Sequence, residues 1–156
     1  MLSLLVALSV PDAHATDVGR SKRIGVGIEV GAPAGLSAKY FFNEKQGVSV
    51  HVGAWTTSRV YVAGQFEFEF IELGDFSWAR ADLYGLAGVE SGYIYISPFN
   101  NGYLGLYGGA AAELQFHDAP INLYLELGIG LAMTSDGVQP IVVPAAHSTL
   151  GARWHF

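Results

Sequence analysis

The amino-acid sequence predicts an all-β fold, an eight-stranded antiparallel up-and-down transmembrane β-barrel. Apolar and polar residues alternate with a period of two along most of the chain, which is typical of strands with two different faces. Hydrophobic residues make up 51% of the 156 residues and charged residues 14%, yet no segment approaches the roughly 18 unbroken apolar residues of a membrane helix. The last residue, Phe156, is aromatic and follows an alternating segment, a feature that outer-membrane barrels share as a class.

Composition narrows the function classes further. The formal net charge of −6 argues against a nucleic-acid partner, because phosphate contacts need a basic surface. Cysteine is absent, which excludes disulfides, a thiolate metal site and a lipid-carrying cysteine. The 20 glycines and the aromatic share of 13% suit a barrel, where glycine eases strand curvature and aromatic residues collect at membrane interfaces. We expect no cofactor.

The N-terminal residues have the pattern of a cleaved signal peptide. Leu2–Val10 is a short apolar run, Pro11 interrupts it, and Ala13-His14-Ala15 supplies a small-x-small cleavage pattern. The first three residues carry no Lys or Arg, and a short buried helix is the alternative interpretation. We therefore expect a signal peptide over residues 1–15, a short N-terminal segment over 16–23, and the barrel over 24–156.

The first four strands are predicted by clear alternation. They cover residues 24–31, 36–42 and 48–54, and a fourth strand alternates most clearly over 65–70. Tight turns are expected at 32–35, 43–46 and 73–75.

The last four strands are longer. They cover about 77–92, 104–116 and 121–131, and a last strand that reaches Phe156. The segment 117–120 is a predicted short turn, whereas 93–102 and 134–144 are predicted long loops. Outer-membrane barrels have short periplasmic turns and longer outer loops, so we expect the two long loops on the outside.

Aromatic residues are expected to form two belts, one at each membrane interface. One belt would lie at the periplasmic strand ends and the other at the outer ends. The periplasmic set is Phe42, Phe70, Trp78, Phe116, Trp154 and Phe156, and the outer set is Trp55, Tyr61, Tyr93 and Tyr103. Alternation by itself leaves a soluble lipocalin-like barrel or a β-sandwich open as an alternative.

Polar residues share one parity on the predicted strands, so we expect them to face the inside. The expected interior network is Glu29, Lys39, His51, Glu67, Glu69, Arg80, Asp82, Glu90, Glu113, Glu126 and Arg153. Seven acids against three bases do not balance, so some carboxylates would share protons or be bridged by water, His51 or tyrosine hydroxyls. A structural polar plug is favoured over a cation-favouring pathway, because an eight-stranded barrel is just wide enough for its own side chains.

No catalytic residue is assigned. Some small outer-membrane barrels modify lipid A, and such an enzyme needs a nucleophilic serine close to a histidine and an acid. The adjacent pair His147 and Ser148 would point to opposite faces of a strand, so this histidine cannot easily serve this serine. No histidine pair has helical metal-ligand spacing, so we expect no metal site.

Three segments carry a resemblance to a known family: Ile24–Phe42, His117–Gly128 and Leu150–Phe156. The chain resembles a family of uncharacterised bacterial outer-membrane proteins, similar in type to OmpX and the OmpA membrane domain. The shared elements are a Gly-x-Pro-x-Gly-Leu-Ser turn with a Lys-Tyr pair, an Asp-Ala-Pro turn and a terminal Gly-x-Arg pattern. In this chain the first of these is Gly31, Pro33, Gly35, Leu36, Ser37, Lys39 and Tyr40. The resemblance implies the barrel fold and no defined activity.

These observations lead to a non-enzymatic role at the surface of a Gram-negative-type bacterium, in its outer membrane. Surface contacts are expected at the two long loops, with Tyr93, Tyr95 and Phe99 as candidates. The expected partners are outer-membrane lipid and lipopolysaccharide, a surface protein, and the barrel assembly machinery through the C-terminal strand with Trp154 and Phe156. A narrow cation-favouring pore is the first alternative, and a lipid A-modifying enzyme is the second.

Overall fold

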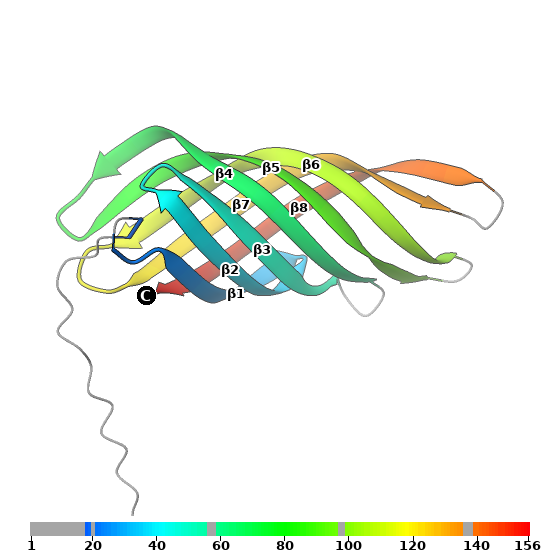
Figure 1. The fold of residues 1–156 in the computed structure, drawn as a ribbon, viewed down its shortest axis with the longest axis horizontal. Helices are drawn as coiled ribbons and strands as arrows, with labels where there is room; N and C mark the ends of the chain where they lie inside the picture. Colours follow the sequence, from blue (N-terminus) through cyan, green and yellow to red (C-terminus); the bar gives the residue numbers. More distant parts are fainter. Residues whose placement is uncertain (1–17, 20, 56–58, 97–98, 136–138) are drawn as a thin grey trace, which may run out of the picture.

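The computed structural model of the protein describes residues 18–19, 21–55, 59–96, 99–135 and 139–156, so the expected signal peptide lies outside the described residues. Each strand pairs antiparallel with the next, and the last pairs with the first, so the sheet closes into a barrel (Figure 1). The strands are β1 (Ile24–Ala32), β2 (Ala34–Asn43), β3 (Gln46–Trp55), β4 (Arg59–Asp75), β5 (Ala79–Ile96), β6 (Phe99–Phe116), β7 (Ile121–Ser135) and β8 (Pro140–His155). The predicted closed barrel of eight antiparallel strands is confirmed. Within the described ranges, no helix is long and apolar enough to cross a membrane.

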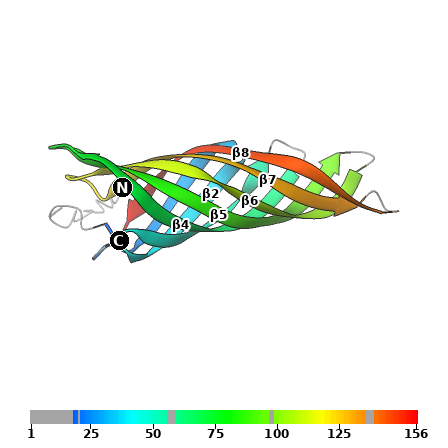
Figure 2. The ribbon, with the colours of Figure 1, turned by 90° about the horizontal axis from the view of Figure 1, so that it is seen from above.

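The seam between β1 and β8 closes the ring. Its register runs from Gly25 opposite His155 to Ala32 opposite Ser148, and the Phe156 N–H donates to the Ile24 carbonyl at 2.8 Å. Gly27 lies so close to β8 that a Cβ atom there would clash with the carbonyl of Ala152. We call the end of the barrel that holds Ile24 and Phe156 the terminal end, and the opposite end the distal end (Figures 1 and 2).

The strands differ in length around the ring. β1, β2 and β3 have 9 or 10 residues, whereas β4 to β8 have 15 to 18. The long strands project beyond the short ones, with the β4–β5 hairpin at the terminal end and the β5–β6 and β7–β8 hairpins at the distal end (Figure 1). The first three strands have the length that a tilted membrane strand needs, and the other five exceed it.

The turn predicted at residues 73–75 is wrong. These residues belong to β4, and Gly74 and Asp75 pair with Ala81 and Arg80 of β5. Two register shifts, between Glu69 and Ile71 and between Glu72 and Gly74, carry the pairing past the glycine. Such bulges insert an unpaired residue and bend the strand without ending it.

The two predicted long loops are also wrong. β5 and β6 stay paired from Tyr93 opposite Gly102 to Ile96 opposite Phe99, and β7 and β8 stay paired up to Ser135 opposite Pro140. The prolines of β8 are compatible with a strand because β1 ends opposite Ser148. Residues 140–147 therefore have β7 as their only paired strand, and proline is tolerated on such an unpaired edge.

The outer surface of the barrel is apolar. The predicted alternation places Val, Ile and Leu side chains outward on every strand, and Ile129 and Leu106 are 78% and 66% exposed. We call these outward apolar side chains the apolar belt. Its other exposed members include Val26, Ile28, Leu36, Val50, Val52, Val62, Val89, Leu104, Leu125, Leu127 and Leu150.

One of the two aromatic belts is present. At the terminal end, Phe42, Phe70, Trp78, Trp154 and Phe156 are exposed and Phe116 is half-buried against Trp78. At the distal end, the prediction that Tyr61 and Tyr103 belong to an aromatic belt is wrong. Both side chains are buried inside the barrel, because they share the parity of the polar residues on β4 and β6. Tyr93 points outward, and the side chain of Trp55 lies outside the described residues.

Candidate functional site: the polar interior

The inward side chains form three groups along the barrel. The central network contains Glu29, Lys39, His51, Glu67, Glu113, Glu126 and Arg153, all of them buried. The terminal cluster contains Glu69, Arg80 and Asp82, and the distal pair is Arg59 with Glu90. The structure therefore places every residue of the predicted interior network inside the barrel, and adds Arg59.

Lys39 of β2 links two carboxylates in the central network. Its Nζ lies 2.5 Å from Glu67 Oε2 and 2.5 Å from Glu113 Oε1, with all three side chains fully buried. The ammonium group also lies 4.4 Å and 4.3 Å from the ring centroids of Phe41 and Tyr84. Two carboxylates and two aromatic faces together replace the water that the ammonium loses on burial.

Arg153 of β8 binds a second pair of carboxylates. Its Nη1 donates to Glu113 Oε1 at 3.3 Å and its Nη2 donates to Glu126 Oε1 at 3.2 Å. Its Nε donates to the Ser37 hydroxyl at 3.1 Å, and the guanidinium plane lies 3.7 Å from the Tyr124 ring centroid. The planar fork of arginine suits these simultaneous contacts, which a lysine could not make.

Glu29 of β1 accepts three hydrogen bonds. The hydroxyls of Tyr61 and Tyr124 donate at 2.5 Å and 3.0 Å, and His51 Nδ1 lies 2.7 Å from Glu29 Oε2. His51 and two tyrosine hydroxyls therefore contact this interior carboxylate, whereas their bridging of two carboxylates stays a prediction.

Sequence reasoning missed several members of the network. Gln65 Nε2 donates to Glu67 at 3.0 Å and to Glu126 at 3.1 Å, and its Oε1 accepts from Tyr107 at 2.9 Å. His147 stacks on the Tyr107 ring at 5.4 Å between centroids. The signal that could have found these residues is their parity, since each lies on the polar face of its strand.

The terminal cluster is a smaller ion-pair group, and its arginine is partly exposed to solvent. Arg80 donates from Nη2 to Glu69 at 2.7 Å and from Nε to Asp82 at 2.8 Å, and its side chain is 25% exposed. Lys45, which is 70% exposed, lies 3.5 Å from Glu69. Glu72 Oε2, 52% exposed, lies 3.9 Å from Arg80 Nη2, so two cations serve the two buried carboxylates and this exposed one.

The distal pair contains a cation outside the predicted interior network. Arg59 is the first residue of β4 and pairs with Ile94 of β5. Its Nη2 donates to Glu90 at 2.9 Å, and its guanidinium lies 3.9 Å from the Tyr103 ring centroid. Glu90 thus has its own cation within the barrel.

Charge is unbalanced in the central network. Its four carboxylates, Glu29, Glu67, Glu113 and Glu126, face two permanent cations, Lys39 and Arg153. With neutral histidines, two negative charges stay uncompensated in a region where the side chains are buried. Uncompensated buried charge raises the free energy of the folded state, so additional positive charge would stabilise this network.

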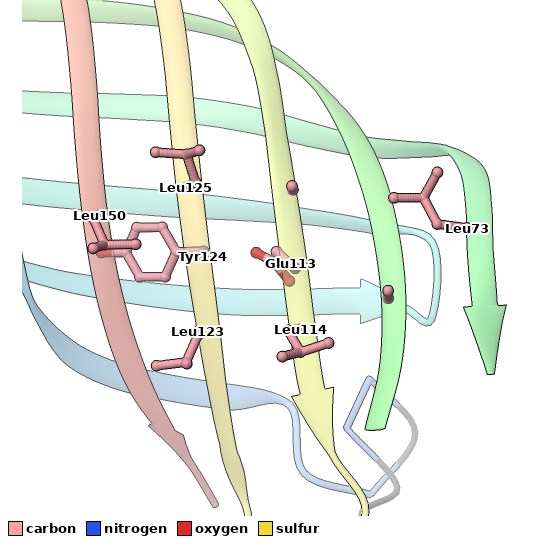
Figure 3. Close-up of a pocket in the computed structure, with 9 residues that line it drawn as sticks. Leu73, Glu113, Leu114, Leu123, Tyr124, Leu125 and Leu150 are labelled. Atoms are coloured by element: carbon pink, nitrogen blue, oxygen red, sulfur yellow. The ribbon is translucent and has the colours of Figure 1, made fainter. Parts of the chain in front are cut away.

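Hollows on the outside of the barrel are shallow and apolar. One, of about 270 Å³, is lined by Leu73, Leu114, Leu123, Leu125 and Leu150 together with small residues (Figure 3). Glu113 and Tyr124 also border it, but their side chains are buried on the inner side. Such a hollow can receive an apolar chain and offers little polar surface for chemistry.

The candidate surface residues lie on a strand and not in a loop. Tyr93 and Tyr95 project outward from β5 near the distal end, 38% and 55% exposed, with ring centroids 4.8 Å apart. Phe99 begins β6, but its side chain lies outside the described residues. His147 is buried whereas Ser148 is exposed, as expected for neighbours on opposite faces.

Comparisons of the chain with protein-family models, with curated proteins and with solved structures found no significant match.

Proposed function

We propose that the chain is a small outer-membrane β-barrel of a Gram-negative-type bacterium, with a sealed polar interior and a structural or surface-interaction role. The observation that carries this proposal is the distribution of side chains. Apolar residues cover the outside and charged residues fill the inside, the reverse of a water-soluble protein.

The apolar belt supports lipid as the surrounding solvent. Exposing apolar surface to water costs about 25 cal/mol for each Å². Most outward Val, Ile and Leu side chains of this barrel are 40–80% exposed, and they encircle the ring. The aromatic belt at the terminal end also favours a membrane, because Trp and Phe anchor at the interface.

The packing of the interior favours a sealed barrel over the alternative of a narrow cation-favouring pore. Lys39, Arg153, Glu67, Glu113 and Glu126 have fully buried side chains that bind one another across the lumen. Ions could pass only if this network opened. The excess of carboxylates is the one feature that would favour cations if it did.

Conductance in planar lipid bilayers tests the sealed interior. We expect the folded, inserted wild-type chain to give no ion current, with insertion verified by protease protection in vesicles. As a control for sensitivity, Lys39→Ala with Arg153→Ala removes both central cations and should give transient current if the variant still inserts. Steady, cation-selective current through the wild type would overturn the sealed interior in favour of the pore.

The surface role is tested at the distal end. Replacing Tyr93 and Tyr95 with serine should weaken binding to lipopolysaccharide-containing vesicles or to neighbouring cells, and should leave the fold unchanged. The matched control is Tyr40→Ser, since Tyr40 is 42% exposed but lies near the terminal end. Unchanged binding in the double variant would remove these tyrosines from the proposal. A change in lipid A mass on expression would instead support the enzyme alternative.

A further inference from the structure

We propose that the central network binds a divalent transition-metal ion of the zinc type, held by His51 Nε2 with carboxylate oxygens of Glu126 and Glu67. The three residues come from β3, β7 and β4, and one ligand atom from each lies within 4.8 Å of the others. This inference is independent of the proposed membrane role, because the donors are inside the barrel.

The orientation of His51 leaves one ring nitrogen free to ligate. Its Nδ1 lies 2.7 Å from Glu29 Oε2, and Glu29 also accepts from two tyrosine hydroxyls, so the carboxylate acts as acceptor and Nδ1 carries the hydrogen. The lone pair of the neutral ring is therefore on Nε2. Histidine ligands of metal ions are held in this way by a carboxylate on the opposite ring nitrogen.

The Nε2 atom of His51 is buried and unpartnered. The His51 side chain is fully buried, and Nε2 has no hydrogen-bond partner among the residues that the structure describes. Glu126 Oε2 lies 3.9 Å from this nitrogen. A buried lone pair aimed at a carboxylate is unfavourable unless a cation lies between them.

Glu126 presents one oxygen to this position. Its Oε1 accepts from Arg153 and Gln65, whereas its Oε2 faces His51, His147 and Thr149. His147 Nε2 lies 3.4 Å from the same Oε2, so a second imidazole nitrogen is near the ion. Two imidazoles and one or two carboxylates form a donor set that zinc accepts.

Charge supports a divalent ion in particular. The central network has two more carboxylates than permanent cations, and the terminal cluster and the distal pair contain their own cations. One divalent ion would restore neutrality. Bonds of about 2.0–2.2 Å to zinc require the three ligand atoms to move closer by roughly 1 Å, within the reach of side-chain rotation.

Refolding with and without metal tests the site. The untagged full chain is unfolded in urea, stripped with chelator, and refolded into detergent micelles with or without ZnCl₂. After removal of free metal, we expect about one zinc ion for each folded chain and a higher urea midpoint in the zinc sample. With Co²⁺ in place of zinc, visible absorption bands of imidazole and carboxylate coordination should appear.

Three variants make the test specific. His51→Gln should lose bound zinc and the gain in urea midpoint. His155→Gln is the matched control, because His155 is also buried with unpartnered ring nitrogens but is outside the ligand group, and it should bind zinc like the wild type. Glu29→Gln should weaken zinc affinity about 10–100-fold by releasing the His51 ring.

The wild type decides the outcome even if a variant does not fold. Folded wild-type protein without bound zinc and without Co²⁺ bands would overturn the proposal. Zinc retained equally by His51→Gln and His155→Gln would also overturn it.

Discussion

The guanidinium group of Arg153 connects residues from three other strands. It contacts Ser37 on β2, Glu113 on β6, and both Tyr124 and Glu126 on β7. A buried cation with this many partners leaves several carboxylates unpaired when it is removed, and the cost of unpaired buried charge exceeds the value of the contacts themselves.

Arg153→Ala is therefore expected to lower the free energy of unfolding by about 3–5 kcal/mol. Arg59→Ala should cost roughly 1–2 kcal/mol, because Arg59 pairs with Glu90 and its side chain is 16% exposed. Lys45→Ala, at 70% exposure, should change stability by less than about 0.5 kcal/mol. Urea unfolding in micelles, followed by tryptophan fluorescence, measures all three. Equal losses for Arg153 and Lys45 would contradict the buried network.

The hydroxyl of Tyr61 donates a hydrogen bond to Glu29. Tyr61→Phe keeps the ring and removes a hydrogen bond to a charged acceptor, so we expect a loss of about 1.5–3 kcal/mol. Tyr95→Phe is the matched control, since Tyr95 is 55% exposed on the outer face, and it should be nearly neutral. The same urea titration distinguishes them, and a neutral Tyr61→Phe would argue against the bond to Glu29.

At the scale of single residues, the sequence predicted which side chains face the inside of the barrel, but not which of them contact one another. Alternation placed Lys39, Glu67 and Glu113 on inward faces, because parity is a local property. Their contact depends on strand register and on the diameter of the barrel, and Lys39 and Glu113 are 74 positions apart. Tyr61 and Tyr103 lie near the ends of their strands but are buried inside the barrel, because parity and not strand-end position decides which way a side chain points.

Among the elements, the β1–β8 seam tolerates little change. Gly27→Ala would drive a methyl group into the Ala152 carbonyl, and we expect a loss of about 1–3 kcal/mol or failure to close. Gly64→Ala is the control, because a Cβ there meets nothing within 4 Å and the substitution should stabilise by about 0.4–1 kcal/mol. Unfolding midpoints measure both, and a harmless Gly27→Ala would mean that the seam is looser than described.

The presence of each strand could be predicted from the sequence, but the residues at which each strand begins and ends could not. The period of two predicts every strand, but Asn100, Asn101 and Gly102 predict a loop, because such residues usually mark turns. In the barrel they pair with Tyr95, Ile94 and Tyr93 on the neighbouring strand. Cross-strand hydrogen bonds outweigh the weak local preference, and only the register shows where pairing stops.

The whole molecule has an apolar outside and a charged inside, which gives a direct test of the membrane proposal. The chain refolded in detergent should migrate differently on a gel when it is not heated than when it is boiled, because the closed barrel resists unfolding by the gel detergent. A soluble monomer in detergent-free buffer, with no difference in migration, would contradict the proposal.

The seam between β1 and β8 also affects how the barrel folds. Gly25 pairs with His155, so closing the ring joins segments at nearly opposite ends of the described chain. Bringing such distant segments together costs entropy before any hydrogen bond repays it, which makes ring closure a slow step. Until β8 docks, β1 presents an open edge that can pair with other chains. We therefore expect residues 148–155, which pair with β1, to affect both the rate of folding and the risk of aggregation.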